Sequence, residues 1–527
     1  MTSLAVADPV QPSTAHLFHE KLQTSSIEDP LREQCISSAQ RLPDDILVLI
    51  FEESLSLTMH WQSGLWTSPW LLGTVCRRWR EATISYPSLW SGITFFPNEF
   101  TGIPLQIQQE RLETLLARAG DSQPLKICVS TRHLPSTKPM RLLFRTFLSH
   151  IHRSKVLTVF DGKLPNGIRS LSVFHPGDHN GQFPAFQHLE ALEIRTAGDA
   201  WVQWPPLRNT PLLTNLKISK TLLFPFPAFC WANSRTISLT RCRCRASDLL
   251  EAIRLAANSL IDLTIHNPDP HLLPGVFTGR NRSPPSLPLD DDLLVIDLLA
   301  LTTLSLGFED KTAGEMRFII AHLRTPRLTS LSLTTPSDEC IPSFLAFARS
   351  SDLGACLRAL TVNLPPSEGY EDFVEFLGEL DSLATLIIVG DAQGRVRGLE
   401  SGRSSFDRRV DALLRALRWP SAHGVQEAST SDPIHIHDNP FRICPTLSSL
   451  EFDDSTMSLQ LLKDMVRSRR HLTHGPPGSL LRSATLKDVV FTEDDSESSW
   501  KWLRDMEKEG VITRSSLSGN VLTIFEG

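Results

Sequence analysis

A short leucine motif, LxxLxL, recurs along the chain and restricts its possible folds more than any other feature. Copies or close variants begin at Ile168, Leu189, Leu213, Leu260, Leu301, Leu328, Leu357, Leu383 and Leu447, with weaker copies at Thr236 and Leu481. Counting Thr236, the starts from Leu189 to Leu260 are 24, 23 and 24 residues apart, and those from Leu301 to Leu383 are 27, 29 and 26 apart. Steps of 41 residues after Leu260 and 64 after Leu383 require inserted segments.

These regular steps match the period of leucine-rich repeats, which is about 20 to 29 residues. In such a repeat, each LxxLxL forms a short strand whose alternate apolar side chains point into the stack, and the following helical stretch covers the other side of the strand. We therefore predict an α/β fold in which residues 150–527 form a leucine-rich-repeat-like solenoid of short parallel strands alternating with helices. Pro-rich or polar composition predicts inserted loops near 266–290, 391–405 and 420–445.

Amphipathic spacing predicts several of the intervening helices. The segment ASDLLEAIRLAANSL begins at Ala246, EDFVEFLGEL begins at Glu371, and FDRRVDALLRALRWP ends at Pro420. A further helix, WKWLRDMEKEG, is expected to begin at Trp500. Helices thus alternate with the leucine motifs, as the solenoid requires.

Residues 42–96 have a different character, because five of the chain's 11 tryptophans lie there. A first helix is expected at Pro43, which suits the first helical position, with Asp44 and Asp45 favoured by the positive end of the helix dipole. Helical spacing gives this helix one apolar side, formed by Leu42, Ile46, Leu49 and Ile50.

A second helix is expected to begin at Pro69, with Ser68 as its N-cap. Its predicted apolar side, at spacing i, i+3, i+4 and i+7, consists of Leu72, Val75, Cys76 and Trp79. Arg77, Arg78 and Arg80 then occupy the opposite face, and the segment MHWQSGLWT between the two helices is expected to be a loop.

The segments LPDDILVLIF, VCRRWRE and PSLW, in this order, resemble an F-box, in particular those of proteins abundant in mushroom-forming (basidiomycete) fungi. The resemblance implies a small helical element that docks on the Skp-type adaptor of a cullin-RING (SCF) ubiquitin ligase. By motif position, the residues that form the docking face or the core beneath it are Leu42, Pro43, Ile46, Ile50, Leu72, Val75, Cys76, Trp79 and Trp90. One departure from the short F-box pattern is a longer loop between the first two helices.

The predicted organisation is therefore an extension at residues 1–40, an F-box domain at 41–96, a connecting segment at 97–149 and the solenoid. The implied function is a substrate-recognition subunit that binds the adaptor, and through it a cullin, and captures an unknown protein target on its repeats. The alternative is a leucine-rich scaffold unconnected with ubiquitination. An enzyme is the third hypothesis, but no short catalytic motif is found, so no catalytic residue and no cofactor are predicted.

Charge and cysteine content exclude other classes of function. The formal net charge of −7 gives no overall attraction for nucleic acid, and the basic runs CRRWR and RSRRH are short enough to be solvated helix faces. The longest apolar stretch, from Leu293, contains Asp297 and is too short for a membrane span. Nine cysteines without paired spacing indicate reduced thiols, and hence a cytoplasmic or nuclear protein.

Two short clusters contain residue types that can bind metal ions. His435, His437 and Asp438 could be read as metal ligands, but beyond the two histidines no third firm ligand is evident. No metal site is therefore predicted. Cys242 and Cys244 are one residue apart and lack the spacing of a C-x-x-C clamp, so packing or a turn is expected for both.

Overall fold

The computed structural model of the chain forms two compact units, which are described separately. The first comprises Met1–Trp90 with Arg118–Gly120, and the second Ser91–Ala117 with Asp121–Gly527. The structure describes residues 42–58, 69–95, 105–130, 146–147, 149–161, 186–196, 202–203, 210–222, 231–242, 244, 246–266, 295–307, 313–334, 340–364, 370–390, 405–418, 443–470, 480–491 and 497–515.

The described part of the first unit is helical. It contains α2 (Asp44–Thr58), α3 (Pro69–Leu72), α4 (Arg77–Ser85) and a 3-10 turn, η1 (Pro87–Trp90). The first predicted helix is present, and the two aspartates lie in its first turn. Its buried residues, Leu47, Val48 and Phe51, face α4 and η1.

The second predicted helix is wrong as a single element, because the chain turns between α3 and α4. The amide groups of Gly73, Thr74 and Val75 bond back to the carbonyls of Pro69, Leu71 and Leu72, closing the short helix α3. Cys76 is extended (φ −157°, ψ 171°) and caps the separate helix α4. Glycine and two β-branched residues in succession have low helix propensity, which explains a break that the apolar spacing did not reveal.

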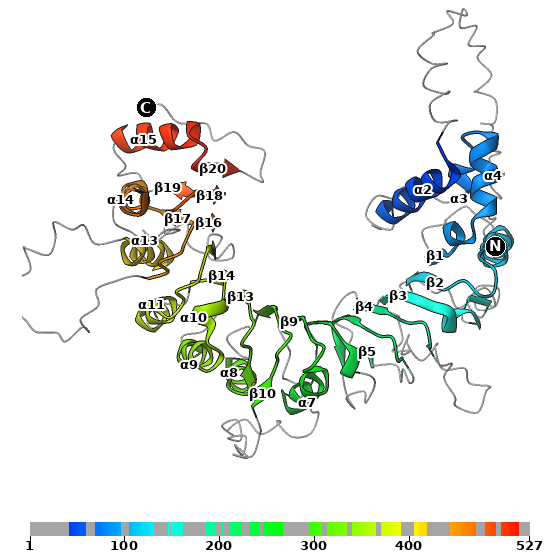
Figure 1. Ribbon diagram of the computed structural model, residues 1–527, viewed down its shortest axis with the longest axis horizontal. Helices are drawn as coiled ribbons and strands as arrows, with labels where there is room; N and C mark the ends of the chain where they lie inside the picture. The colour runs from blue at the N-terminus through cyan, green and yellow to red at the C-terminus, as the bar shows by residue number, and fades with distance from the viewer. Residues whose placement is uncertain are drawn as a thin grey trace, which may run out of the picture. The chain divides into compact units, whose positions relative to one another are not determined.

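The second unit is built on a parallel sheet of fourteen described strands whose order follows the chain order. They are β1 (Gly92–Phe95), β2 (Leu125–Ser130), β3 (Ser154–Asp161), β4 (Ala191–Thr196), β6 (Asn215–Ser219), β8 (Thr236–Thr240), β9 (Asp262–His266), β11 (Thr303–Gly307), β13 (Ser330–Thr334), β14 (Ala359–Asn363), β15 (Thr385–Val389), β16 (Ser449–Asp453), β18 (Ser483–Lys487) and β20 (Ile512–Ser515). In Figure 1 the helices of this unit lie along one side of the sheet.

The α/β architecture and its solenoid-like alternation of parallel strands and helices agree with the prediction. Each LxxLxL copy from Leu189 to Leu481 runs into one strand of the sheet, whereas the copy at Ile168 lies outside the described residues. The sheet also extends toward the N-terminus beyond residue 150, since β1 pairs with β2 and β2 with β3. These strands lack the leucine motif.

Helices and smaller sheets complete the second unit. The helices are α5 (Leu105–Ala119), whose last two residues belong to the first unit, α7 (Ala246–Ala256), α8 (Ala313–Ala321), α9 (Ile341–Ser351), α10 (Leu353–Cys356), α11 (Tyr370–Gly378), α13 (Ser405–Leu417), α14 (Leu459–Arg470) and α15 (Glu497–Lys508), with 3-10 turns η2 (Ile151–Arg153) and η4 (Trp231–Asn233). Two-stranded sheets join β5 (Val202–Gln203) to β7 (Thr221–Leu222), β10 (Ile296–Asp297) to β12 (Leu323–Arg324), and β17 (Thr456–Met457) to β19 (Val490–Phe491). The four helices predicted between the leucine motifs are present as α7, α11, α13 and α15. The three predicted loops lie almost entirely outside the described residues.

The core of the second unit lies between the sheet and its helices. In β11, Leu304 and Leu306 are fully buried, and the same alternation recurs from strand to strand. Phe344, Phe373 and Phe376 of α9 and α11 form an aromatic cluster in the same layer. Because full burial of one such side chain contributes about 1.5–3 kcal/mol, the repeated leucines account for the stacking of the repeats.

Gly390, directly after β15, marks a close approach between neighbouring repeats. A Cβ atom at this position would overlap the main-chain oxygen of Asp454, and the Gly390 amide donates to the Asp453 carbonyl at 2.7 Å. We expect Gly390→Ala to destabilise the protein by about 1–3 kcal/mol, because the backbone must shift and this bond must lengthen.

The matched control is Gly378→Ala, because Gly378 lies at the end of α11 with no atom within 4 Å of an added Cβ. Alanine at a helical position is favoured over glycine by roughly 0.5–1 kcal/mol, so this variant should be unchanged or slightly more stable. Urea unfolding of both full-length variants measures the difference. Equal stability of the two would show that the approach at Gly390 is not tight.

Candidate functional site

The first unit presents an apolar surface to solvent on α2. Ile46, Leu49 and Ile50 are 40%, 59% and 43% exposed, respectively, and their spacing places them on one side of the helix. The opposite side supplies the buried residues of α2. A group of neighbouring exposed apolar side chains on one side of a helix is typical of a protein-binding surface. We call Ile46, Leu49 and Ile50 the α2 docking surface.

The structure sorts the nine residues predicted from motif position into three groups. Leu72 and Trp90 are buried and belong to the core. Leu42, Cys76 and Trp79 are partly buried. Pro43, Ile46, Ile50 and Val75 are exposed and remain candidates for direct contact. The prediction omitted three exposed apolar residues among the described residues of the same unit, Leu49, Leu71 and Ile84.

Two aromatic contacts hold the helices of this unit together. Phe51 of α2 packs edge-on against Trp79 of α4, with ring centroids 4.8 Å apart. Trp90 packs edge-on against Trp70 at 5.1 Å, and its indole Nε1 donates to the Thr83 carbonyl at 2.7 Å. The guanidinium carbon of Arg118 lies 4.2 Å from the centroid of the Trp90 ring. Trp79 and Trp90 therefore support the docking surface from beneath.

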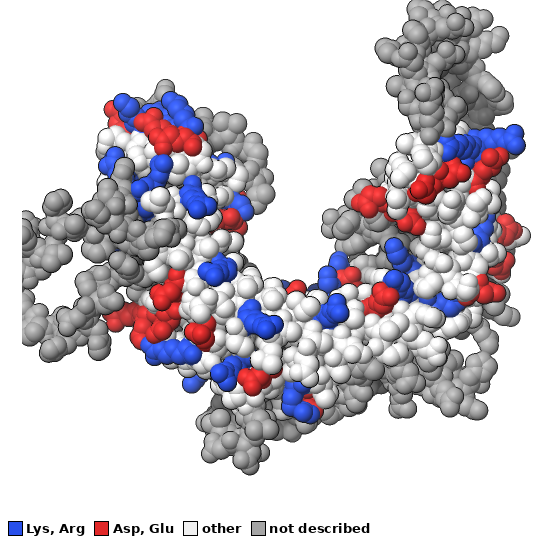
Figure 2. Space-filling view, in the orientation of Figure 1, with Lys and Arg blue, Asp and Glu red and all other residues white. Residues whose placement is uncertain are grey.

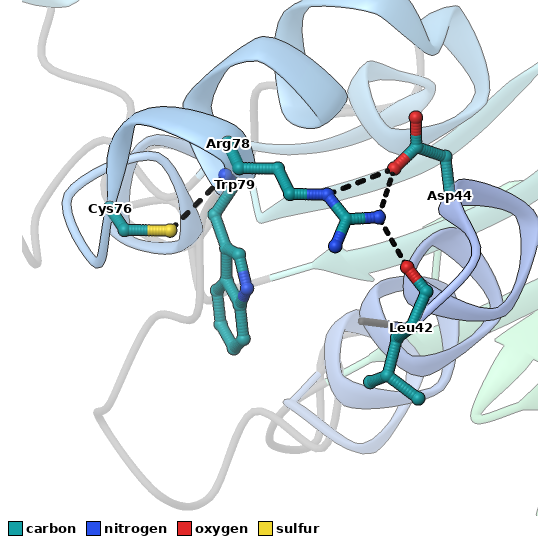
Figure 3. Close-up of polar contacts among 5 residues, drawn as sticks. All are labelled: Leu42, Asp44, Cys76, Arg78 and Trp79. Atoms are coloured by element: carbon teal, nitrogen blue, oxygen red, sulfur yellow. Dashed lines mark hydrogen bonds and ion pairs between the residues drawn. The ribbon is translucent and has the colours of Figure 1, made fainter. Parts of the chain in front are cut away.

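Polar contacts fix the beginning of each helix (Figure 3). The Cys76 sulfur accepts the Trp79 amide at 3.5 Å and thereby caps α4. Arg78 reaches from α4 to the start of α2, where its Nη2 and Nε donate to Asp44 Oδ1 at 2.6 and 3.2 Å. The same Nη2 donates to the main-chain carbonyl of Leu42.

The second unit offers a different surface, the face of the sheet opposite the helices. The register aligns its exposed and half-exposed side chains in rows. The middle row consists of Glu193, Lys217, Ser238, Thr264, Ser305, Ser332, Thr361, Ile387, Glu451 and Thr485. Serine and threonine occupy its centre, whereas the charged residues lie toward the ends. Glu193 pairs with Arg195 and Glu451 with Lys487, each at 2.6 Å. We call this surface the open face.

His266 lies near the middle of the open face. Its Nε2 is 2.8 Å from Ser305 Oγ, and its ring lies beside Gly307, where an added Cβ would be 3.2 Å from two ring carbons. Burial lowers the pKa of His266, so the imidazole is neutral near pH 7. Neutral hydroxyl and imidazole groups both donate and accept hydrogen bonds, and therefore suit uncharged polar groups of a polypeptide.

The basic run near Arg467 does not form a solvated face throughout, and this part of the prediction is wrong. Arg469 is completely buried, and its guanidinium donates to the carbonyls of Leu417, Cys444 and Ile443 at 2.8, 3.0 and 2.7 Å. Burial lowers the pKa of Arg469 to about 10. Arg467, two residues earlier, is exposed. Arg469 thus satisfies three main-chain acceptors inside the repeat stack.

All seven described cysteines are free thiols. Cys242 is buried as predicted and donates to the Ile218 carbonyl at 3.4 Å, while burial raises the pKa of the neighbouring Cys244 thiol. Cys444 donates to the Leu377 carbonyl at 3.4 Å, and burial raises the pKa of this thiol to about 12.

Within the described ranges, no group of three His, Cys, Asp or Glu side chains is placed to hold a metal ion. His435, His437 and Asp438 lie outside those ranges. Of the helices that the structure describes, none is both long and apolar enough to cross a membrane. The chain matches no protein-family model and no curated protein in the comparisons with known proteins.

Proposed function

We propose that this protein is a substrate-recognition subunit of an SCF-type (cullin-RING) ubiquitin ligase. The α2 docking surface carries the proposal, because it places Ile46, Leu49 and Ile50 in solvent within the segment that resembles an F-box. In this proposal the surface binds a Skp-type adaptor, and the adaptor links the chain to a cullin. The repeats bind a protein target.

The proposed mechanism is tethering, without a reaction carried out by this chain. Holding a target and the adaptor on one chain raises the effective concentration of the target beside the ligase's ubiquitin carrier. The open face supports this role, since it offers rows of uncharged hydroxyl side chains over many consecutive strands. Figure 2 shows basic and acidic side chains interspersed over the visible surface of the second unit, a distribution unlike the basic stripe used to bind nucleic acid. The free thiols fit a cytoplasmic or nuclear protein.

Direct binding to the adaptor tests the proposal. The purified full-length chain is mixed with a purified Skp-type adaptor, and the mixture is analysed by size-exclusion chromatography with light scattering. We expect a complex with one copy of each protein. A folded chain that fails to bind the adaptor would contradict the proposal and favour a leucine-rich scaffold unconnected with ubiquitination.

A further inference from the structure

We infer that Arg78 is a positioning residue for the α2 docking surface, an inference that rests on the proposed function. Its guanidinium holds two points at the start of α2, the Asp44 carboxylate and the Leu42 carbonyl. Leu42 precedes the helix, and Asp44 is its first residue. A single side chain of α4 therefore fixes both the chain entering α2 and the first turn of the helix (Figure 3).

The position of Arg78 within α4 indicates that it does not serve the stability of α4. Arg77 and Arg78 are the first two residues of this helix, where the positive end of the dipole disfavours cations. Arg77 offsets this effect within its own helix by pairing with Glu81 at 2.8 Å. Arg78 instead directs its charge to another helix, where Asp44 lies 2.6 Å away.

The contact complements the apolar packing between the two helices. The contact between Phe51 and Trp79 holds the later turns of α2 against α4. Arg78 instead contacts the first turn of α2. This turn is closed by a hydrogen bond from the Leu47 amide to the Pro43 carbonyl at 3.0 Å. Without Arg78, α2 would keep its apolar contact with α4, but the first turn of α2 would no longer be held by hydrogen bonds from α4. Binding the adaptor would then require this segment to be ordered, which reduces affinity.

Adaptor titrations of full-length variants test this inference. Arg78→Ala should weaken adaptor binding about three- to tenfold, the range expected when an ordered segment must be fixed upon binding. Arg77→Ala is the matched control, since Arg77 pairs within its own helix, and should leave affinity unchanged. Arg78→Lys should give an intermediate affinity, because one ammonium group keeps the charge but cannot reproduce the planar arrangement of donors.

Asp44→Asn tests the other partner. If the two residues act through one contact, Arg78→Ala combined with Asp44→Asn should weaken binding no more than Arg78→Ala alone. Independent, additive losses would contradict the inference. Thermal unfolding distinguishes positioning from stability: a large fall in Tm for Arg78→Ala would assign the residue a structural role and overturn the inference.

Hydrogen exchange provides a measurement that does not depend on the adaptor. Peptides covering residues 42–51 should exchange faster in Arg78→Ala than in Arg77→Ala, because the first turn of α2 opens more often. Equal exchange in the two variants would overturn the inference even if the wild-type chain binds the adaptor. If the wild-type chain does not bind, the proposed function fails, and faster exchange in Arg78→Ala alone would still establish the positioning of α2.

Discussion

Replacing Ile46 and Ile50 together by aspartate should abolish adaptor binding, with a loss of affinity of roughly 100-fold or more, and leave thermal unfolding unchanged. Both side chains are exposed, so the native fold accommodates carboxylates at these positions. In a complex, the same carboxylates would be transferred from water into an apolar interface without partners, which is strongly unfavourable. Isothermal titration of the adaptor into each full-length chain measures the loss.

The matched control carries the same two changes at similarly exposed apolar residues of the repeat array, Leu255→Asp and Ile261→Asp. This variant has the same added charge and should bind the adaptor as the wild type does. Retained binding by the Ile46 and Ile50 variant would exclude α2 as the docking surface. Equal losses in both double variants would show that the effect arises from net charge.

Arg469→Ala should destabilise the second unit by on the order of 3–5 kcal/mol, because it removes a fully buried side chain and leaves main-chain acceptors without their donor. The carbonyls involved belong to Leu417, at the end of α13, and to Ile443 and Cys444. A guanidinium at the C-terminal end of α13 is also favoured by the helix dipole. Urea unfolding followed by circular dichroism measures the change.

Two further variants separate the causes of this destabilisation. Arg467→Ala, in the same turn of α14, is the control for helix propensity and charge, and should change stability little. Arg469→Met restores much of the lost volume but no donor, so a variant as unstable as Arg469→Ala would identify the lost hydrogen bonds as the main cause. Wild-type stability in Arg469→Ala would contradict its place in the core.

The strands of the repeat array could be predicted from sequence because one pattern determines both their position and their buried face. The docking surface could not be assigned in the same way. Residues 46–51 are all apolar, so almost any choice of helical spacing gives α2 an apolar side. Only the packing against α4 and η1 shows that Leu47 and Phe51 are buried while Ile46 and Ile50 are exposed.

Arg469 and the open face were not predictable, because each depends on residues far apart in sequence. The acceptors of Arg469 lie 25 to 52 residues away along the chain, so the local sequence RSRRH carries no sign of burial. The serines and threonines of the open face are common residues within any one repeat. They form a row only after the strand register aligns Ser238, Thr264, Ser305 and Ser332.

Because the order of the described strands in the sheet follows their order in the chain, the sheet can grow during synthesis. Each strand of the sheet pairs with the strands that precede and follow it within that sheet, and even β15 and β16 are separated only by residues 390–448. Each pairing between described strands of this sheet can therefore form once the next strand has been synthesised, because each strand pairs only with its predecessor and its successor. The N-terminal repeats can thus fold on the ribosome while the C-terminal repeats are still being translated.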